Sequence, residues 1–429
     1  MAAEVAHPQT PLTSRAGEAA ARFPPVTDQT YFRKGFGLKD AIQGALTEDY
    51  HSGIVDEVRS RGYQLSVDGI TVRLAKEFGF CYGVDRAVEY AYETRRKFPE
   101  RRNFLVGEII HNPHVNAKLS SMGIVLIERS AEGEFDFSSV THDDVVILPA
   151  FGVTKEDFDR LRALDCVLVD TTCGSVLNVW KRVESYAKGG FTALIHGKYF
   201  HEETKATASQ VTKHAGGKYL VVRNMTEARM VCDYIEHGTG LAALRERFAK
   251  AASPDFDFER DLVRIGVANQ TTMLSGESLA IAAEVRQSIV RHGGEAAAAE
   301  RFRSFDTICS ATQERQDAVV KMLEDGVDIC VVIGGYNSSN TQHLAALCAQ
   351  KVRTYYVEDS ACLRPDTRTI RHQPVGSHEE VSETDWLPAG PLVVGVTAGA
   401  STPNNKVGEV IERIFATRGI EVGPTLVKA

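Results

Sequence analysis

Long hydrophobic runs are missing from this chain of 429 residues, and so is any excess of positive charge. A membrane-spanning helix needs about 20 consecutive apolar residues, whereas runs such as residues 145–153 have only the length of a strand. We therefore expect no membrane partner. The net charge of -8 also disfavours nucleic acid, because a phosphate backbone is bound by an excess of basic residues. An anionic ligand must instead be bound by basic or hydrogen-bond-donating side chains gathered at one site.

Cysteine and proline are sparse as well. The chain has eight cysteines, too few for a secreted protein stabilised mainly by disulfide bonds. It has 14 prolines, fewer than is typical of a disordered chain. The N-terminus lacks the layout of a secretory signal, and Glu4 and Glu18 are unusual in a transit peptide. We expect a bacterial cytoplasmic protein rather than one of the plastid stroma. No Walker loop or dinucleotide fingerprint is present, so ATP or NAD chemistry has no support.

Short β-branched runs alternate with helical patterns through most of the chain. They lie at residues 104–110, 145–148, 167–169, 192–195, 220–222, 264–267, 329–333, 354–357 and 392–396. Continuous apolar strands separated by amphipathic helices are typical of parallel sheets covered on both faces. The fold class is therefore predicted to be α/β, with ligands beyond the carboxyl ends of strands. Before these runs, residues 1–28 read as a flexible tail and residues 31–66 as an added helical segment.

Three of the eight cysteines differ from the rest because they stand in loops directly before helical patterns. These are Cys81 in Gly-Phe-Cys-Tyr-Gly, Cys173 in Asp-Thr-Thr-Cys-Gly and Cys309 in Asp-Thr-Ile-Cys-Ser. A thiol at a helix N-terminus is expected to have a lowered pKa, which favours the metal-binding thiolate. Spacings of about 90 and 135 residues match no local metal motif, so spacing alone leaves metal ligation open. If the thiols converge, three of them suit a 4Fe-4S cluster with one open iron.

The remaining cysteines fall inside apolar runs or helices, where a free thiol behaves as a small hydrophobic side chain. They are Cys166, Cys232, Cys330, Cys348 and Cys362. We expect these five to be buried and chemically inert.

Polar residues follow several of the predicted strands and would suit a small anion. They include His111, the stretch from His196 to Thr204 with His201 and Glu203, the stretch Asn269–Thr272, the run Gly334–Thr341 and the stretch Thr397–Ser401. Hydroxyls, amides and backbone N–H groups at a helix N-terminus form a cradle for an oxyanion. Each set alone is also compatible with an ordinary strand end, a solvated helix start or a connecting turn. Five polar strand ends together favour a ligand site.

Taken in order, these motifs resemble those of the 4-hydroxy-3-methylbut-2-enyl diphosphate reductase family of the non-mevalonate isoprenoid pathway. The resemblance runs from about residue 70 to 410. It rests on residues 79–87, 108–112, 170–173, 269–272, 308–312, 337–340 and 396–401. The resemblance implies a two-electron, two-proton reductive dehydroxylation of the allylic diphosphate to isopentenyl and dimethylallyl diphosphate.

The resemblance also implies the architecture of the protein. It predicts three α/β domains (69–172, 173–305 and 306–418) in a pseudo-threefold trefoil, preceded by a tail and helical extension (1–68) and followed by a C-terminal tail (419–429). Each domain is expected to give one cysteine, Cys81, Cys173 or Cys309, to one central 4Fe-4S cluster. The electron donor is expected to be a ferredoxin or flavodoxin. Oligomeric state, donor identity and product ratio do not follow from a single chain.

Site roles are carried over residue by residue from the same resemblance. Glu203 is predicted to be the proton donor, with Thr271 organising proton delivery and contacting substrate. The other predicted substrate-binding residues are His111, His201, Ser338, Ser339, Asn340 and Ser401.

Two departures from the common bacterial pattern stand in the sequence. Phe151 replaces a histidine, and Phe cannot hydrogen-bond a phosphate, so no ligand contact is carried over to that position. A phenylalanine at this position, together with the segment Tyr31–Gly37, resembles the sequence pattern of the plant and cyanobacterial branch of the family. Glu202 and Lys205 stand where the common form has proline and glutamate, which changes the local loop while keeping His201 and Glu203.

Two other classes of protein remain as alternatives. A hydratase or dehydratase would use a three-cysteine cluster as a Lewis acid without net electron transfer, and would show no demand for a reductant. An iron-sulfur sensor that binds DNA is disfavoured by the acidic charge.

Overall fold

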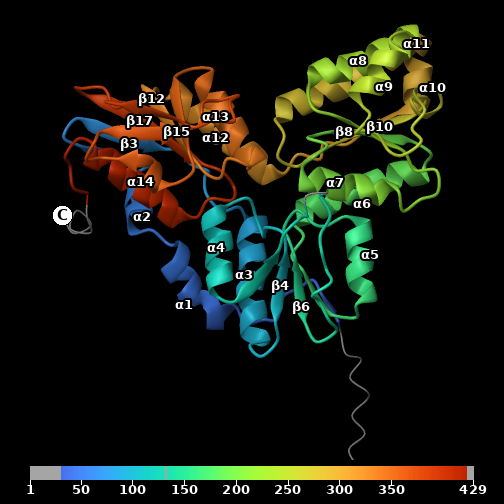
Figure 1. Ribbon diagram of the computed structural model, residues 1–429. Helices are drawn as coiled ribbons and strands as arrows, with labels where there is room; N and C mark the ends of the chain where they lie inside the picture. The colour runs from blue at the N-terminus through green and yellow to red at the C-terminus, as the bar shows by residue number, and fades with distance from the viewer. Residues whose placement is uncertain (1–29, 131–132, 423–429) are drawn as a thin grey trace, which may run out of the picture.

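The computed structural model describes residues 30–130 and 133–422. The predicted tail at residues 1–28 and most of the predicted C-terminal tail lie outside these ranges. The described chain forms three lobes, each built on its own sheet (Figure 1). Within this part of the chain, no helix combines the length and apolar character needed to cross a membrane.

The first sheet has the strand order β1-β7-β6-β4-β5, with all neighbours parallel. Its strands are β1 (Tyr31–Phe32), β4 (Asn103–Val106), β5 (Ile124–Ile127), β6 (Val145–Leu148) and β7 (Val167–Asp170). Its helices are α3 (Tyr82–Lys97), α4 (Pro113–Ser121) and α5 (Lys155–Ala163). Strands β4, β6 and β7 are buried along their whole length, which explains why their sequences are apolar apart from Asn103 at the start of β4 and Asp170 at the end of β7.

The second sheet has the order β11-β10-β8-β9 and is also parallel throughout. Its strands are β8 (Thr192–His196), β9 (Tyr219–Val222), β10 (Ile265–Asn269) and β11 (Phe302–Ser304). Its helices are α6 (Gly174–Lys188), α7 (Glu202–Val211), α8 (Met225–His237), α9 (Leu241–Arg247), α10 (Phe258–Asp261) and α11 (Ser275–Arg301). Helix α11 is broken at Gly294, where φ is 80°.

The third sheet has the order β13-β12-β17-β3-β2. Its strands are β2 (Gln64–Val67), β3 (Ile70–Leu74), β12 (Ile329–Ile333), β13 (Arg353–Val357) and β17 (Leu392–Ala398). Its helices are α12 (Ser310–Glu324), α13 (Ser339–Ala349) and α14 (Asn404–Ala416). Beside it, after the short helix η1 (Ser360–Cys362), stands an antiparallel sheet of β14 (Leu363–Arg364), β15 (Thr369–His372) and β16 (Val381–Thr384).

The predicted α/β class with parallel sheets is confirmed, with two corrections of detail. The edge strand β2 runs antiparallel to β3, and the small β14–β16 sheet is antiparallel. The expected boundary at residue 69 places β3 with the first sheet, whereas β3 pairs with β17 in the third. Pairing with β17 completes an apolar core that includes Ile70, Val72 and Val394.

The predicted helical segment before residue 68 contains α1 (Lys39–Tyr50) and α2 (Gly53–Ser60), but also strands β1 and β2. Helix α1 packs Ile42 and Tyr50 into the core of the first lobe, and α2 packs Val55 and Val58 into the core of the third. The Nδ2 of Asn405 donates a hydrogen bond of 2.7 Å to the backbone oxygen of Asp49 at the end of α1. The segment therefore bridges two lobes (Figure 1).

Candidate active site

The three loop cysteines occupy equivalent positions on three helices. Cys81, Cys173 and Cys309 are the N-cap residues of α3, α6 and α12. All three line one cavity of about 110 Å³. A Cβ atom on Gly83 would lie 2.4 Å from the Sγ of Cys173, so this position on α3 must be glycine for the thiol to approach. The structure thus brings together thiols that are far apart in sequence.

The five other cysteines lie elsewhere and are between 0 and 2% exposed. Their predicted burial is confirmed. The loop trio, in contrast, is partly exposed. Exposure therefore separates the eight thiols into the same two groups that sequence context indicated.

The expectation of lowered thiol pKa values is wrong for Cys81 and Cys173. Burial raises the pKa of both thiols, and the backbone N–H of Val84 at the start of α3 only partly opposes this for Cys81. A bound metal ion would reverse this shift, because metal coordination deprotonates a thiol.

The spacing of the thiols bears on the kind of metal group they fit. Among the described residues, their sulfur atoms do not form a group within 4.8 Å of one another. Ligands of a single zinc ion would all lie about 2.3 Å from the metal. Three separated thiols around a shared cavity fit a polynuclear iron-sulfur group instead.

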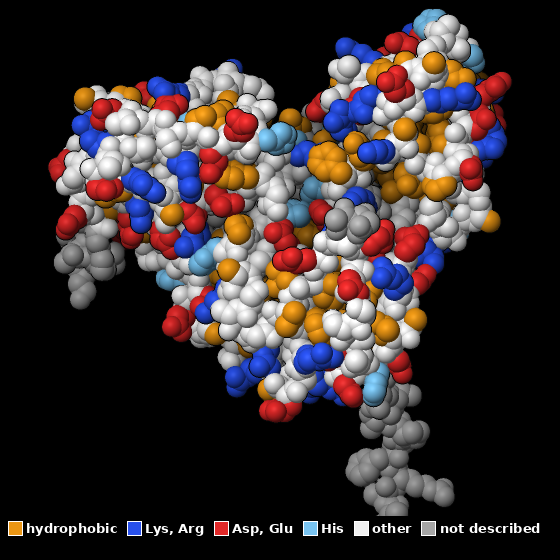
Figure 2. All heavy atoms as spheres, in the orientation of Figure 1, with side chains coloured by type: hydrophobic (Ala, Val, Ile, Leu, Met, Phe, Trp, Pro, Cys, Tyr) orange, Lys and Arg blue, Asp and Glu red, His pale blue; other side chains and the backbone are white. Residues whose placement is uncertain are grey.

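The polar residues predicted from strand ends line the same cavity as the cysteines. They are His111, His201, Glu203, Thr271, Ser338, Ser339, Asn340 and Ser401. The cavity meets a larger chamber of about 1060 Å³ lined by residues from all three lobes. Figure 2 shows this chamber as a hollow between the lobes, with histidine side chains visible inside it.

Glu203 is held by both atoms of its carboxyl group. Its Oε1 accepts the backbone N–H of Thr271 at 2.6 Å, and its Oε2 accepts the Thr271 hydroxyl at 2.9 Å. Burial raises the pKa of Glu203 to about 7, although the two hydrogen bonds from Thr271 act in the opposite direction. The backbone oxygen of Thr271 also accepts the N–H of Cys309 at 3.3 Å. A carboxyl group that can hold or release a proton near neutral pH therefore lies beside the cysteine loop.

His201 has its protonation state fixed by the start of α7. Its Nδ1 accepts the backbone N–H of Glu203 at 3.1 Å, and burial, with the nearby His111, holds the pKa of His201 well below its usual range. The ring is therefore neutral and carries its proton on Nε2. An N–H group on that atom is a donor suited to a phosphate oxygen.

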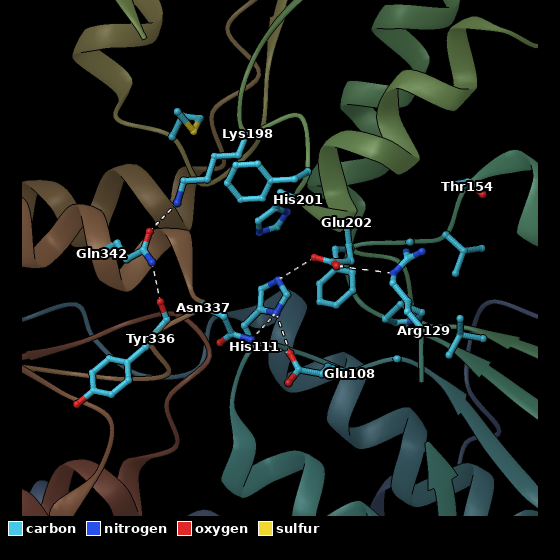
Figure 3. A pocket seen from close by; sticks show the side chains of 18 of the residues that line it. Glu108, His111, Arg129, Thr154, Lys198, His201, Glu202, Tyr336, Asn337 and Gln342 are labelled. Atoms are coloured by element: carbon cyan, nitrogen blue, oxygen red, sulfur yellow. Dashed lines mark hydrogen bonds and ion pairs between the residues drawn. The ribbon is translucent and has the colours of Figure 1, made fainter. Parts of the chain in front are cut away.

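His111 is oriented by a carboxylate and by an aromatic ring. Its Nδ1 lies 2.9 Å from Oε2 of Glu108, and Asn337 lies on the same side of the ring (Figure 3). Its Nε2 is buried and has no hydrogen-bond partner, but it faces Oε2 of Glu202 at 3.9 Å (Figure 3). Asn340 has a similarly unpartnered Nδ2, while its Oδ1 accepts the N–H of Ala400. Two polar atoms in one cavity thus lack partners that a ligand would supply.

His111, His201 and Glu202 together could also be considered as a site for a single cation, because their ligating atoms lie within 4.8 Å of one another. A metal needs the lone pair of an imidazole nitrogen. The His201 nitrogen that faces outward carries a proton, since Nδ1 is already an acceptor. In this tautomer His201 is not a ligand, so a cation would have only His111 and Glu202, whose Oε2 lies 3.9 Å from Nε2 of His111.

Phe151 has a definite role in the arrangement although it cannot bind a phosphate. Its ring stacks on His111 with centroids 4.6 Å apart and planes at 14°. Such a contact is worth about 0.5–1.5 kcal/mol. It fixes the plane of the imidazole opposite the Glu108 carboxylate.

Replacing Phe151 by alanine is therefore expected to raise the KM for the allylic diphosphate implied by the family resemblance about 2- to 10-fold, because His111 loses its stacking partner. Phe151→His keeps an aromatic ring and should retain a KM closer to that of the wild type. Steady-state kinetics of the two variants measure this. An unchanged KM in Phe151→Ala would show that the stack does not orient His111.

Sequence reasoning missed several residues that position the site. Glu108 was part of a recognised motif without a role, and Gln270 accepts the hydroxyl of Thr204 and the N–H of Lys198. Asp170 accepts both the N–H and the hydroxyl of Thr172, which shapes the Cys173 loop. The sequence feature that could have identified Asp170 was its place at the end of a buried strand that leads into the Cys173 loop.

Comparison with known proteins places the chain among its relatives. A sequence profile described as LytB protein matches residues 72–415. The chain belongs to the LytB family. The 4-hydroxy-3-methylbut-2-enyl diphosphate reductase of Gloeobacter violaceus is 49% identical over 401 residues, covering 92% of this chain and 95% of that protein. The enzyme of the same name from Thermosynechococcus vestitus is 46% identical over 395 residues, covering 92% and 96%.

The predicted family is therefore confirmed, and these LytB relatives are cyanobacterial, as Phe151 and the segment Tyr31–Gly37 indicated. A solved structure of the E-1-hydroxy-2-methyl-but-2-enyl-4-diphosphate reductase from Plasmodium falciparum has a TM-score of 0.58 at 20% identity. The structural match covers 80% of this chain and 87% of the Plasmodium falciparum chain. This likeness supports the LytB fold.

Proposed function

We propose that the chain is a reductase that converts 4-hydroxy-3-methylbut-2-enyl diphosphate to isopentenyl and dimethylallyl diphosphate, the last step of the non-mevalonate pathway. Relatives that bear this name match more than nine-tenths of both chains, in agreement with the activity expected from the sequence. One observation carries the proposal: three thiols, a buried carboxyl group and a set of anion-binding donors line a single cavity.

Cys81, Cys173 and Cys309 would hold one 4Fe-4S cluster. Their number and their separation fit such a group. When bound, the cluster supplies electrons and an open iron that acts as a Lewis acid on the substrate hydroxyl. The three cysteines come from three helices, which supports a trefoil arrangement with domain divisions at residues 172/173 and 305/306.

The diphosphate group is bound by donors that surround the cavity. His201 presents its Nε2–H, and Asn340 presents the Nδ2 that has no partner within the protein. Ser338 is the N-cap of α13, so the backbone N–H groups of Ser339 and Asn340 lie at the start of that helix. His111 of the first lobe and Ser401 of the third complete the lining, and the Ser401 hydroxyl donates to the backbone oxygen of His111 at 3.0 Å. These donors orient the substrate with its hydroxyl toward the cysteines.

Glu203 donates the proton that allows the hydroxyl to leave as water. Hydroxide is a poor leaving group, and a carboxyl group with a pKa of about 7 matches the task of protonating it. Thr271 holds both carboxyl oxygens and links them to the Cys309 loop. Two electrons, supplied singly by a ferredoxin or flavodoxin, and a second proton at carbon balance the reaction.

The experiment is anaerobic purification with iron and sulfide analysis, followed by an assay on hydroxymethylbutenyl diphosphate with and without reductant. We expect about four irons per chain and product formation that requires reductant. Turnover without reductant would favour the dehydratase class instead. Protein without iron would contradict the cluster.

A further inference from the structure

Lys198 stands in the turn between β8 and α7, three residues before His201, and its side chain crosses the large chamber. Its Nζ donates a hydrogen bond of 2.6 Å to Oε1 of Gln342 on α13 (Figure 3). Its backbone N–H is held by Gln270 at 3.1 Å. A cation from the second lobe therefore reaches a neutral side chain of the third.

The charge of Lys198 is not neutralised by the protein. Among the described residues, its ammonium group has the amide of Gln342 as its hydrogen-bond partner and forms no ion pair within 4.0 Å. The side chain is half-buried, and that burial lowers the pKa of Lys198. A partly desolvated cation with only an amide for a partner is costly, and an anion entering the chamber would remove that cost.

The partners of Lys198 belong to the oxyanion cradle described above. Gln342 donates from Nε2 to the backbone oxygen of Tyr336 at 2.6 Å, within the loop that leads into α13. Gln270 donates from Nε2 to the Ser339 hydroxyl at 3.4 Å. The ammonium group is thus linked to the elements that present Ser338, Ser339 and Asn340. Lys198 and His201 also both line the large chamber.

We propose that Lys198 is an additional diphosphate-binding residue, which exchanges the Gln342 amide for a phosphate oxygen and so joins the second and third lobes across the bound substrate. This inference rests on the proposed function, because that function supplies the diphosphate. A charge-assisted hydrogen bond to phosphate is roughly twice as strong as one to a neutral amide, which favours the exchange. The ligand class is a diphosphate monoester, and inorganic pyrophosphate shares the recognised group.

The test compares Lys198→Gln and Lys198→Arg with Lys205→Gln in the iron-loaded enzyme. Lys205 is a matched control because it is half-buried on the adjoining helix α7 but lines neither cavity. We expect Lys198→Gln to weaken pyrophosphate binding, measured by calorimetry, and to raise KM, each by about 10- to 100-fold. The kcat of Lys198→Gln should stay within about threefold of the wild-type value, because Lys198 binds the diphosphate and takes no part in proton transfer.

Lys198→Arg should recover most of the affinity, and Lys205→Gln should bind pyrophosphate within about twofold of the wild type. Unchanged binding and KM in Lys198→Gln, or an equal loss in Lys205→Gln, would overturn the inference. Calorimetry with pyrophosphate does not depend on turnover. A wild type that binds pyrophosphate but does not reduce the substrate would therefore refute the proposed function while leaving this inference to be decided by the variants.

Discussion

Glu203→Gln is expected to lower kcat by at least about 100-fold, because general acid catalysis contributes about 10²- to 10⁴-fold. Glutamine keeps the size of the side chain and one of the two acceptors for Thr271, but its amide N–H groups are not acidic. KM should change little, since Glu203 is bound to Thr271 rather than placed among the diphosphate donors. Single-turnover assays with pre-reduced enzyme measure the effect without interference from electron delivery.

The same residue sets the expected pH dependence. The active form is the acid, and the pKa of Glu203 lies at about 7, so kcat should fall as the pH rises through 7. Glu203→Gln should lose this limb of the profile. A variant whose kcat equals that of the wild type, or one that keeps the same alkaline limb, would show that another group donates the proton.

The free energy of unfolding of Glu203→Gln, compared with that of the wild type, is the control for this substitution. A raised pKa in the folded state means that the stability contributed by protonated Glu203 is present below the ordinary pKa of 4.5 and is lost as the pH rises through about 7. Above pH 7, the ionised side chain costs about 3 kcal/mol by this linkage. Glu203→Gln should therefore unfold no more easily than the wild type at pH 8. Inactivity combined with normal stability would locate the defect in chemistry.

Cys173→Ser is expected to abolish turnover and to leave the protein with little bound iron. Serine is a far poorer ligand for an iron-sulfur cluster than thiolate, and the other two thiols come from different helices that cannot compensate. Iron and sulfide analysis, with the visible absorption of the purified protein, measures the loss. Retention of wild-type iron content would exclude Cys173 as a ligand.

Cys166→Ala is the matched control for this loss. Cys166 is 2% exposed and packs in a core cluster of the first lobe, away from the cavity. Its replacement should reduce stability modestly while preserving iron content and turnover. A similar loss of iron in both variants would point to general instability rather than to a missing ligand.

Much of this site could be predicted because its chemistry is local in sequence. Cys81, Cys173 and Cys309 stood out through the turn residues and helix starts beside them, and the structure makes each an N-cap. The polar strand ends at His111 and Thr271 could be read in the same way, because a buried parallel strand must be followed by residues that leave the sheet. The roles assigned to these residues remain predictions for the variants to test.

The remaining features depend on contacts that a linear pattern does not contain. The thiol pKa values follow burial in the assembled cavity, which outweighs the local effect of a helix N-terminus at Cys81. Lys198 and Gln342 are brought together only by the arrangement of two lobes. The small β14–β16 sheet was missed because charged residues and proline interrupt its sequence, so it lacks the apolar runs that marked the larger sheets.

The pairing of β3 with β17 has a consequence for how the protein is made. Ile70 pairs with Leu392, about 320 positions later in the chain. During synthesis from the N-terminus, all strands of the first and second sheets are available before β17 has been made. The β2–β3 hairpin must wait with an unpaired edge and the apolar side chains of Ile70 and Val72 uncovered. The third lobe, and with it the complete site, is therefore expected to form last, and the waiting hairpin is the segment of the nascent chain most in need of protection from aggregation.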